Sequence, residues 1–258
     1  MPARFRPRLG RLLPQGPVDI LRQVLVFVIA YLGYRIARGA VDDRVGAAAA
    51  FEHARQLIGV ERSLGVFVEP HVQAWAVGRP LIIDAASWIY LNAQFTVTVA
   101  ALVYLYFAHN RSFYFVRNMF AVAMAVALIG YILLPTAPPR FFPEWGFADS
   151  VSDMLRVSHD NVAADALFNP YAAIPSMHVA FALMIAVPIA RLARHRITRV
   201  AWSLYPLLVT FVIVATANHF LADAAAGGLT AALGASAAFW LARARPGAWT
   251  FKDAEVAT

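Results

Sequence analysis

Long apolar stretches separated by polar segments recur along the chain and dominate its pattern. A helix needs about 20 apolar residues to cross the hydrocarbon core of a bilayer, and six stretches approach that length. They lie at about Val18–Ile36, Ile82–Phe107, Phe113–Leu134, Met177–Leu192, Val200–Ala217 and Leu221–Ala242. The pattern predicts an all-α, polytopic integral membrane protein with six transmembrane helices.

The segments between these stretches differ in length and character. Only Ala108–Ser112 separates the second and third stretches, which predicts an antiparallel pair of helices. The first long connection, Ala37–Leu81, mixes acidic residues with apolar runs and predicts short interfacial helices. The second, Pro135–Ile174, is rich in proline, phenylalanine and acidic residues, and long loops of this kind are often functional. Pro188 predicts a kink within the short fourth stretch.

We expect a single membrane domain over residues 1–258. Its core, about 82–242, carries the motifs described below, and residues 1–81 form an N-terminal anchor helix with an interfacial segment. Several arginines before the first apolar stretch resemble the start of a signal peptide. Arg35 and Arg38 at the end of that stretch favour an uncleaved anchor.

The composition supports a membrane protein and narrows the chemistry. Hydrophobic residues make up 60% of the chain and charged residues 14%, whereas soluble domains carry about a quarter charged residues. The absence of cysteine excludes disulfides, zinc–thiolate sites, iron–sulfur clusters and thiol nucleophiles. Catalysis must therefore use His, Asp, Ser, Arg or a bound ion.

The net charge of +7 matters through its distribution. With six spans, thirteen of the 22 Lys and Arg residues fall on one side: Arg4, Arg6, Arg8, Arg11, Arg111, Arg117, Arg191, Arg194, Arg196, Arg199, Arg243, Arg245 and Lys252. The positive-inside rule then places both termini in the cytoplasm and the two long loops outside the cell membrane. The basic run at 191–199 is accordingly a topology signal, and no nucleic-acid partner is expected.

Three short polar clusters fall on the predicted outward side, at the membrane boundary. They are Pro135–Arg140, Pro175–His178 and Asn218–Asp223, at the end of the third stretch and at the starts of the fourth and sixth stretches. Polar residues that are distant in sequence but at the same depth are what one site assembled from helix ends would require. We therefore expect these clusters to form a single outward-facing site.

The residue types in these clusters suit phosphate chemistry. His219 and Asp223 are four apart and would share a helix face, so the carboxylate could fix the imidazole tautomer and leave the other nitrogen nucleophilic. His178 follows Pro175 and Ser176 at a helix start, where free N–H groups can bind an anion. The guanidinium of Arg140 can bind phosphate oxygens. The alternatives are a structural tether for the His219–Asp223 pair, a helix-capping His178 and a snorkelling Arg140.

These three clusters resemble the motifs of the membrane-embedded type 2 phosphatidic acid phosphatase superfamily. Its motifs contain a Lys and an Arg, a Pro-Ser-Gly-His, and a final His-x-x-x-Asp, in the same order. The clusters look most like the branch related to inositol phosphorylceramide synthases, and the similarity extends from about the second stretch onward. The resemblance implies a lipid phosphotransferase or phosphatase in the bilayer that needs no metal or other cofactor.

The resemblance also implies a role for each residue. His219 would be the nucleophile that takes the phosphoryl group, Asp223 its orienting carboxylate, and His178 the acid that protonates the departing oxygen. Arg140 and the backbone near Ser176 would hold the phosphate, with Asn218 as a further donor. The group would then pass from His219 to a hydroxyl acceptor or to water.

The chain departs from the usual motifs at two cations. Leu133 stands where the superfamily has Lys, Ile213 where it has Arg, and Phe141 where a Pro follows the first Arg. These departures agree with the inositol-transferring branch and weaken simple phosphatidic acid hydrolysis. Besides Asn218, the candidate replacement donors are Arg156, His159 and Tyr171.

Other functions remain open from sequence. A lipid phosphate phosphatase would use water on phosphatidic acid-like or polyprenyl phosphates. A transporter could line a path with Asn92 and Gln94, which we interpret instead as hydrogen bonding between helices. A metal-dependent hydrolase could use His178, His219, Asp223 and His159 as ligands. Aromatic residues such as Trp88, Tyr90, Trp145 and Trp240 are expected to be membrane-interface anchors.

Overall fold

The computed structural model describes residues 14–40, 44–155 and 171–247, and these are mostly helical. The helices are α2 (Pro17–Ala40), α3 (Arg44–Ser63), α4 (Glu69–Val77), α5 (Pro80–Ala108), α6 (Asn110–Leu133), α7 (Ser150–Leu155), α9 (Met177–Leu192), α10 (Arg196–Ala215) and α11 (Leu221–Ala244). Two 3₁₀ turns, η1 (Pro139–Phe141) and η2 (Pro143–Trp145), follow α6. Within the described part, pairing of the β type is confined to one bridge between Thr136 and Ala172.

Each of the six apolar stretches is a helix in the structure, so the all-α membrane fold is confirmed. Four helices, α5, α6, α10 and α11, are long and apolar enough to cross a membrane. The apolar helix α9 has only 16 residues and continues through Pro188. The number of complete spans therefore stays a prediction. His109 alone separates α5 from α6, in agreement with the expected antiparallel pair.

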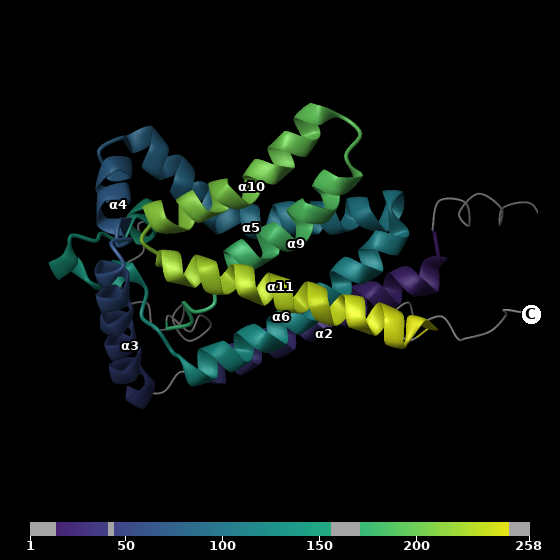
Figure 1. Cartoon of the computed structure of the whole chain (residues 1–258), viewed down its shortest axis with the longest axis horizontal. Coiled ribbons are helices and arrows are strands. Elements are labelled where there is room, and N and C mark those ends of the chain that lie inside the picture. Colours follow the sequence, from purple (N-terminus) through teal and green to yellow (C-terminus); the bar gives the residue numbers. More distant parts are fainter. Residues whose placement is uncertain (1–13, 41–43, 156–170, 248–258) are drawn as a thin grey trace, which may run out of the picture.

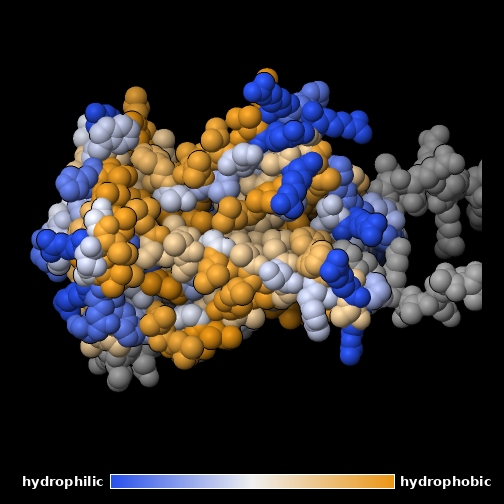
Figure 2. Space-filling model, viewed as in Figure 1, coloured by the Kyte–Doolittle hydropathy of each residue, from blue (hydrophilic) through white to orange (hydrophobic). Residues whose placement is uncertain are grey.

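The surface carries an apolar belt between two polar ends (Figure 2). The long helices run along the longest axis of the molecule, so the belt follows their middle portions (Figure 1). Large apolar side chains such as Leu207, Leu229 and Trp240 are exposed on these helices. Because soluble proteins rarely expose continuous apolar surfaces of this extent, the belt is the surface that contacts lipid.

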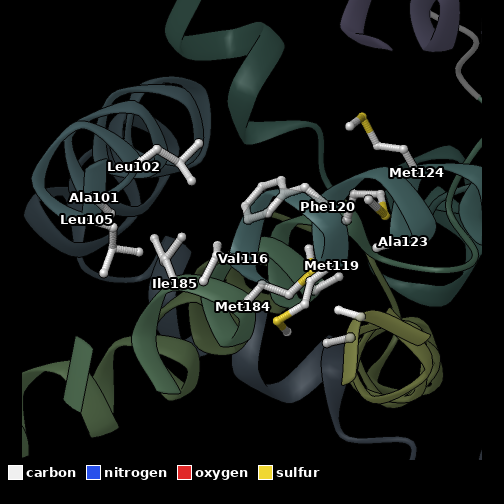
Figure 3. Packing of buried hydrophobic residues seen from close by; sticks show 14 of the residues in the cluster. Ala101, Leu102, Leu105, Val116, Met119, Phe120, Ala123, Met124, Met184 and Ile185 are labelled. Atoms are coloured by element: carbon white, nitrogen blue, oxygen red, sulfur yellow. The ribbon is translucent and has the colours of Figure 1, made fainter. Parts of the chain in front are cut away.

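The main core lies among α5, α6, α9 and α11 (Figure 3). Leu105 from α5, Val116 and Phe120 from α6, and Met184 and Ile185 from α9 are all buried in it. Small residues let α11 approach this core closely. A Cβ atom added at Gly234 would lie 2.9 Å from the carbonyl oxygen of Met119.

A buried polar network fastens α2 to the α5–α6 pair. Asp19 accepts hydrogen bonds from the hydroxyls of Tyr106 at 2.8 Å and Tyr114 at 2.7 Å. Gln23 donates to Asp19 at 2.9 Å and accepts from Arg117 at 2.8 Å. Arg117, which we counted with the basic residues of the cytoplasmic side, is thus buried inside α6.

Two helices from the first long connection cover one end of the bundle. In Figure 1, α3 and α4 stand across the end where α6 finishes and α11 begins. The prediction of helices in this connection is confirmed, but α3 has 20 residues and is not short. Its residues Ala50, Ala54 and Ile58 are fully buried in a cluster with Phe142 and Phe220. The outer helices therefore form part of the packed structure around the candidate site.

Candidate active site

The three polar clusters meet at the end of the bundle that α3 and α4 cover. Arg140 lies in η1 after α6, His178 is the second residue of α9, and His219 comes two residues before α11. In Figure 1, α11 begins near the left-hand end, which α3 and α4 cover, and α9 lies next to it in the middle of the view. The expectation that distant clusters assemble in one place agrees with this arrangement.

His219 and Asp223 form the buried centre of the site. The Nδ1 atom of His219 lies 3.1 Å from Oδ2 of Asp223, and the two residues are 6% and 0% exposed. The same carboxylate oxygen accepts a hydrogen bond from the backbone N–H of Phe220 at 2.9 Å. Because Nδ1 contacts the carboxylate, Nε2 is the imidazole nitrogen that chemistry with a substrate would use.

His219 lies in a turn and not on a helix face as we had expected. Ala217 has φ = 52°, a left-handed conformation that few residues other than glycine adopt. The N–H groups of Asn218 and His219 both donate to the carbonyl of Ile213. These two hydrogen bonds close the C-terminal end of α10. The extended Phe220 then starts α11. The reversal brings His219 back onto Asp223 in the first turn of α11.

His178 faces the same centre from α9. Its ring centroid lies 5.6 Å from that of His219, with the two planes at 64°. On its other side, Tyr90 of α5 stacks on His178 with a centroid distance of 4.5 Å and planes at 22°. Tyr90, which we expect to be a membrane-interface anchor, thus also packs against this imidazole.

The start of α9 is pressed against the start of α11. The N–H of Ser176 donates to the carbonyl of Asp223 at 3.0 Å. A Cβ atom added at Gly227 would lie 2.3 Å from the carbonyl oxygen of Ser176, so only glycine allows this approach. The first hydrogen bond of α9 runs from the N–H of Ala180 to the carbonyl of Ser176. The N–H groups of residues 177–179 lie before this bond, in the first turn of the helix.

Arg140 is held by both backbone and side-chain contacts. Its N–H donates to the carbonyl of Ala217 at 2.9 Å, and its Nη1 donates to Oδ1 of Asn218. Its Nε lies 3.5 Å from Oδ2 of Asp149. Asn218 in turn donates from Nδ2 to the carbonyl and the hydroxyl of Thr216, both at 3.0 Å. The side chain of Asn218 therefore holds Arg140 in place in this structure.

The loop that carries Arg140 is fastened on two sides. The N–H of Ala137 donates to the carbonyl of Ala50 in α3 at 3.0 Å, and His53 contacts the carbonyl of Pro135 at 2.8 Å. On the other side, the N–H of Thr136 donates to the carbonyl of Tyr171 at 2.7 Å. Helix α3 and the segment before α9 thus fix the position of the loop.

A narrow pocket lies between α5, α9 and α10, next to His178. Tyr90 and His178 contribute to its wall, and most of the remaining lining is apolar, including Ile89, Val209 and Ile213. Gln94 also lines this pocket, whereas Asn92 donates to the carbonyl of Trp88 in its own helix. Our interpretation of Asn92 as a bond between helices was wrong.

Of the three other candidate phosphate donors, the structure describes only Tyr171. Arg156 and His159 lie outside the described residues. Tyr171 packs its ring against Phe51 and Phe141, at centroid distances of 6.2 Å and 6.3 Å. Across residues 14–40, 44–155 and 171–247, no group of three or more His, Asp or Glu side chains is arranged to hold a metal ion. The metal hypothesis included His159 and is not tested by the described part alone.

The class of protein follows from the bundle and from the position of its ionisable groups. Helices with an apolar belt gather two histidines, a carboxylate and an arginine at one end, as expected for a membrane-embedded enzyme. The family model described as PAP2 superfamily matches residues 55–238. The chain belongs to this superfamily, the type 2 phosphatidic acid phosphatases, and is a phosphatase or phosphotransferase of lipid phosphates. No curated protein and no solved structure matches it.

Residues 55–238 include α4 and part of α3, so the similarity begins before the second apolar stretch, where we had placed its start. The structure also adds residues that sequence motifs did not identify. Tyr90 contacts His178, Thr216 contacts Asn218, and the carboxylates of Glu61 and Glu69 contact the first turn of α11. No spacing rule connects them to the motifs, because each reaches the site from another part of the fold or through a turn.

Proposed function

We propose that the protein transfers a phosphorylated head group, such as inositol phosphate, from a membrane lipid to a hydroxyl acceptor. The transfer passes through a phosphohistidine at His219. The observation that carries this proposal is the buried His219–Asp223 pair with His178 at a centroid distance of 5.6 Å. One imidazole oriented by a carboxylate and a second beside it supply the nucleophile and the acid of a two-step transfer.

In the first step, Nε2 of His219 attacks the phosphorus atom of the lipid. A phosphorus–nitrogen bond forms, the bond from phosphorus to the lipid oxygen breaks, and His178 gives that oxygen its proton. In the second step, an acceptor hydroxyl attacks the phosphorus, the phosphorus–nitrogen bond breaks, and the hydroxyl proton passes to His178. Each histidine thereby returns to its starting state.

Charge that develops on the phosphoryl oxygens must be stabilised. Arg140 is the side chain proposed for this role, oriented by Asn218 and Asp149. The N–H groups of the first turn of α9 supply further donors. The hydroxyl of Ser176 is fully buried and has no hydrogen-bond partner in the described part of the chain, which leaves it available to a phosphate oxygen.

The pocket beside His178 supports a lipid as the leaving group. In the proposed first step, His178 protonates the lipid oxygen, so the lipid body lies on the His178 side of the phosphorus. The walls of the pocket there are mostly apolar and belong to helices of the membrane belt. The pocket is too narrow to take in an acyl chain, but its apolar walls suit contact with the part of the lipid next to the phosphate.

Burial of the site favours transfer over hydrolysis. His219, Asp223, Ser176 and Asn218 are each at most 6% exposed. A site that excludes water protects a reactive phosphohistidine until an alcohol arrives. Hydrolysis of a phosphatidic acid-like or polyprenyl phosphate by water is the second candidate function. In both cases, we propose that the site faces outward from the cell membrane and that both termini are cytoplasmic.

A product assay tests the proposal. The purified protein is incubated with lipids labelled in the phosphorylated head group, together with candidate hydroxyl acceptors, and the products are separated by chromatography. We expect a labelled acceptor lipid from wild type, a loss of about 10³-fold or more in His219→Ala, and resistance to EDTA. The matched control is His71→Ala on α4. Free phosphate or phosphomonoester as the product under every acceptor would favour the phosphatase, and full activity of His219→Ala would overturn the phosphohistidine.

A further inference from the structure

Two buried glutamates from the outer helices reach the start of α11. Glu61 lies near the end of α3 and Glu69 is the first residue of α4; they are 2% and 0% exposed. Oε1 of Glu61 accepts a hydrogen bond from the N–H of Ala222 at 2.8 Å. Oε1 of Glu69 accepts one from the N–H of Leu221, also at 2.8 Å. Residues far from α11 in sequence thus bind its first turn.

With Asp223, these glutamates give three successive backbone donors a carboxylate partner. Phe220 donates to Asp223, Leu221 to Glu69 and Ala222 to Glu61. A helix normally leaves its first N–H groups without partners, and a Ser, Thr or Asp at the N-cap often satisfies one of them. The N-cap of α11 is Phe220, which has no side-chain acceptor. Helices α3 and α4 therefore supply the N-terminal cap of α11, and this cap lies directly after His219.

The two glutamates also act on each other. The second oxygen of each carboxyl, Oε2, is buried and receives no hydrogen bond from any donor in the described residues. Both carboxyls bind neighbouring N–H groups of one helical turn, and no ion pair within the described residues joins either of them to a cation. Two negative charges at this buried place would repel each other, so one proton held between the pair would leave a single negative charge at the positive end of the helix dipole.

We propose that Glu61 and Glu69 are positioning residues for phosphoryl transfer, fixing the first turn of α11 and thereby the direction of the His219 imidazole as long as they share a proton. Loss of that proton places two negative charges in one buried space and loosens the turn. The inference rests on the proposed role of His219 as nucleophile.

The electrostatics set the direction of the pH response. Burial, with the neighbouring charges of Glu69 on α4 and Asp223 on α11, raises the pKa of Glu61 to about 8, while the N–H of Ala222 acts in the opposite direction. Protonation of Glu61 therefore stabilises the fold fully below its ordinary pKa of 4.5, and this contribution is lost as the pH rises through about 8. We expect kcat to fall in the same interval with little change in KM.

Glutamine replacements separate the proton from the contacts. In Glu61→Gln, the amide keeps an acceptor oxygen for Ala222 and a donor for the carboxylate of Glu69, so the variant resembles a permanently protonated Glu61. It should retain activity near neutral pH and lose kcat less steeply than wild type at alkaline pH. Glu61→Ala removes the acceptor and should lower kcat about tenfold throughout. Glu52→Gln, at an exposed position on the same helix, should match wild type.

The experiment measures kcat and KM for wild type and these variants from about pH 6 to about pH 10. His178 must carry a proton in every variant, so the diagnostic quantity is the difference from wild type in the alkaline limb. A Glu61→Gln profile identical to wild type, or an unchanged kcat in Glu61→Ala, would overturn the inference.

Thermal unfolding gives a readout that does not depend on turnover. The Tm of wild type in detergent should fall as the pH rises through about 8, and the Tm of Glu61→Gln should fall less. If wild type turns over none of the labelled lipids, the proposed function fails while this difference in Tm still tests the shared proton. If turnover is present and the two Tm profiles coincide, the carboxyl pair has no such role.

Discussion

One carboxylate oxygen of Asp223 accepts two hydrogen bonds. Its Oδ2 accepts from Nδ1 of His219 at 3.1 Å and from the N–H of Phe220 at 2.9 Å, while its backbone carbonyl accepts from Ser176. The residue therefore joins the imidazole, the start of α11 and the start of α9. In the proposed mechanism, its carboxylate fixes which imidazole nitrogen carries the proton, and its charge stabilises the imidazole as a phosphoryl group is added.

Asp223→Asn should lower kcat by about 10³-fold, because the amide can present the wrong hydrogen-bonding group to Nδ1 and lacks the charge. KM should change little, since Asp223 has no proposed contact with the substrate. The measurement is steady-state kinetics with a labelled lipid in detergent micelles. Asp84→Asn, at an exposed position on α5, serves as the control. An Asp223→Asn enzyme with wild-type kcat would contradict the orienting role.

Sequence reasoning could nominate His219, Asp223, His178 and Arg140 because ionisable side chains are scarce in an apolar chain. It could not nominate Glu61 and Glu69 as their neighbours. The contact of Glu69 with Leu221 joins residues 152 apart, and that of Glu61 with Ala222 joins residues 161 apart. Contacts of this kind depend on how outer helices fold over the bundle, which hydropathy does not encode.

At the scale of elements, the site depends on how closely α9 and α11 approach. Gly227 of α11 lies against the backbone of Ser176, where a Cβ atom would come within 2.3 Å of a carbonyl oxygen. A backbone group cannot swing aside as a flexible side chain can. The next residue, Gly228, has ordinary space around it, since its Cβ atom would lie 3.8 Å from the side chain of Leu183.

These neighbouring glycines give a matched pair of substitutions. Gly227→Ala should destabilise the protein by about 1–3 kcal/mol through overpacking and should lower kcat about tenfold by moving α9 away from α11. Gly228→Ala should leave both quantities near wild type or raise stability, because alanine favours a helix. Thermal unfolding and kinetics of both variants check this. Equal effects of the two substitutions would show that the close approach is unimportant.

The helices themselves were predictable to different degrees. Helix α9 begins and ends where its apolar stretch does, and α11 extends only two residues beyond its own. Helix α3 was underestimated because it is amphipathic and contains no long apolar run. The turn at His219 was missed because the left-handed conformation falls on Ala217, and alanine gives no signal for it.

At the scale of the whole molecule, the two polar ends of the belt determine which compartment the site faces. The arginines of the α9–α10 connection gather at the end opposite α3 and α4, as expected for a cytoplasmic side. With the proposed orientation, the lipid and the acceptor come from the outer leaflet or the space beside it.

Single cysteines can test this orientation, because the natural chain has none and gives no background. A membrane-impermeant maleimide should label Glu144→Cys in intact cells and should label Arg194→Cys only after the membrane is opened. Both positions are exposed, at opposite ends of the molecule. The unmodified chain is the blank. The reverse pattern would place the site on the cytoplasmic side.

The frame of the site consists largely of peptide groups. Arg140 binds Ala217 and Ser176 binds Asp223 through backbone N–H and C=O atoms alone. Among the coded amino acids, only proline removes such a donor, so other substitutions of Arg140 or Ser176 would leave these two hydrogen bonds in place. A lineage could therefore lose the Lys and Arg that Leu133 and Ile213 replace, keep its geometry, and become free to accept a different head group.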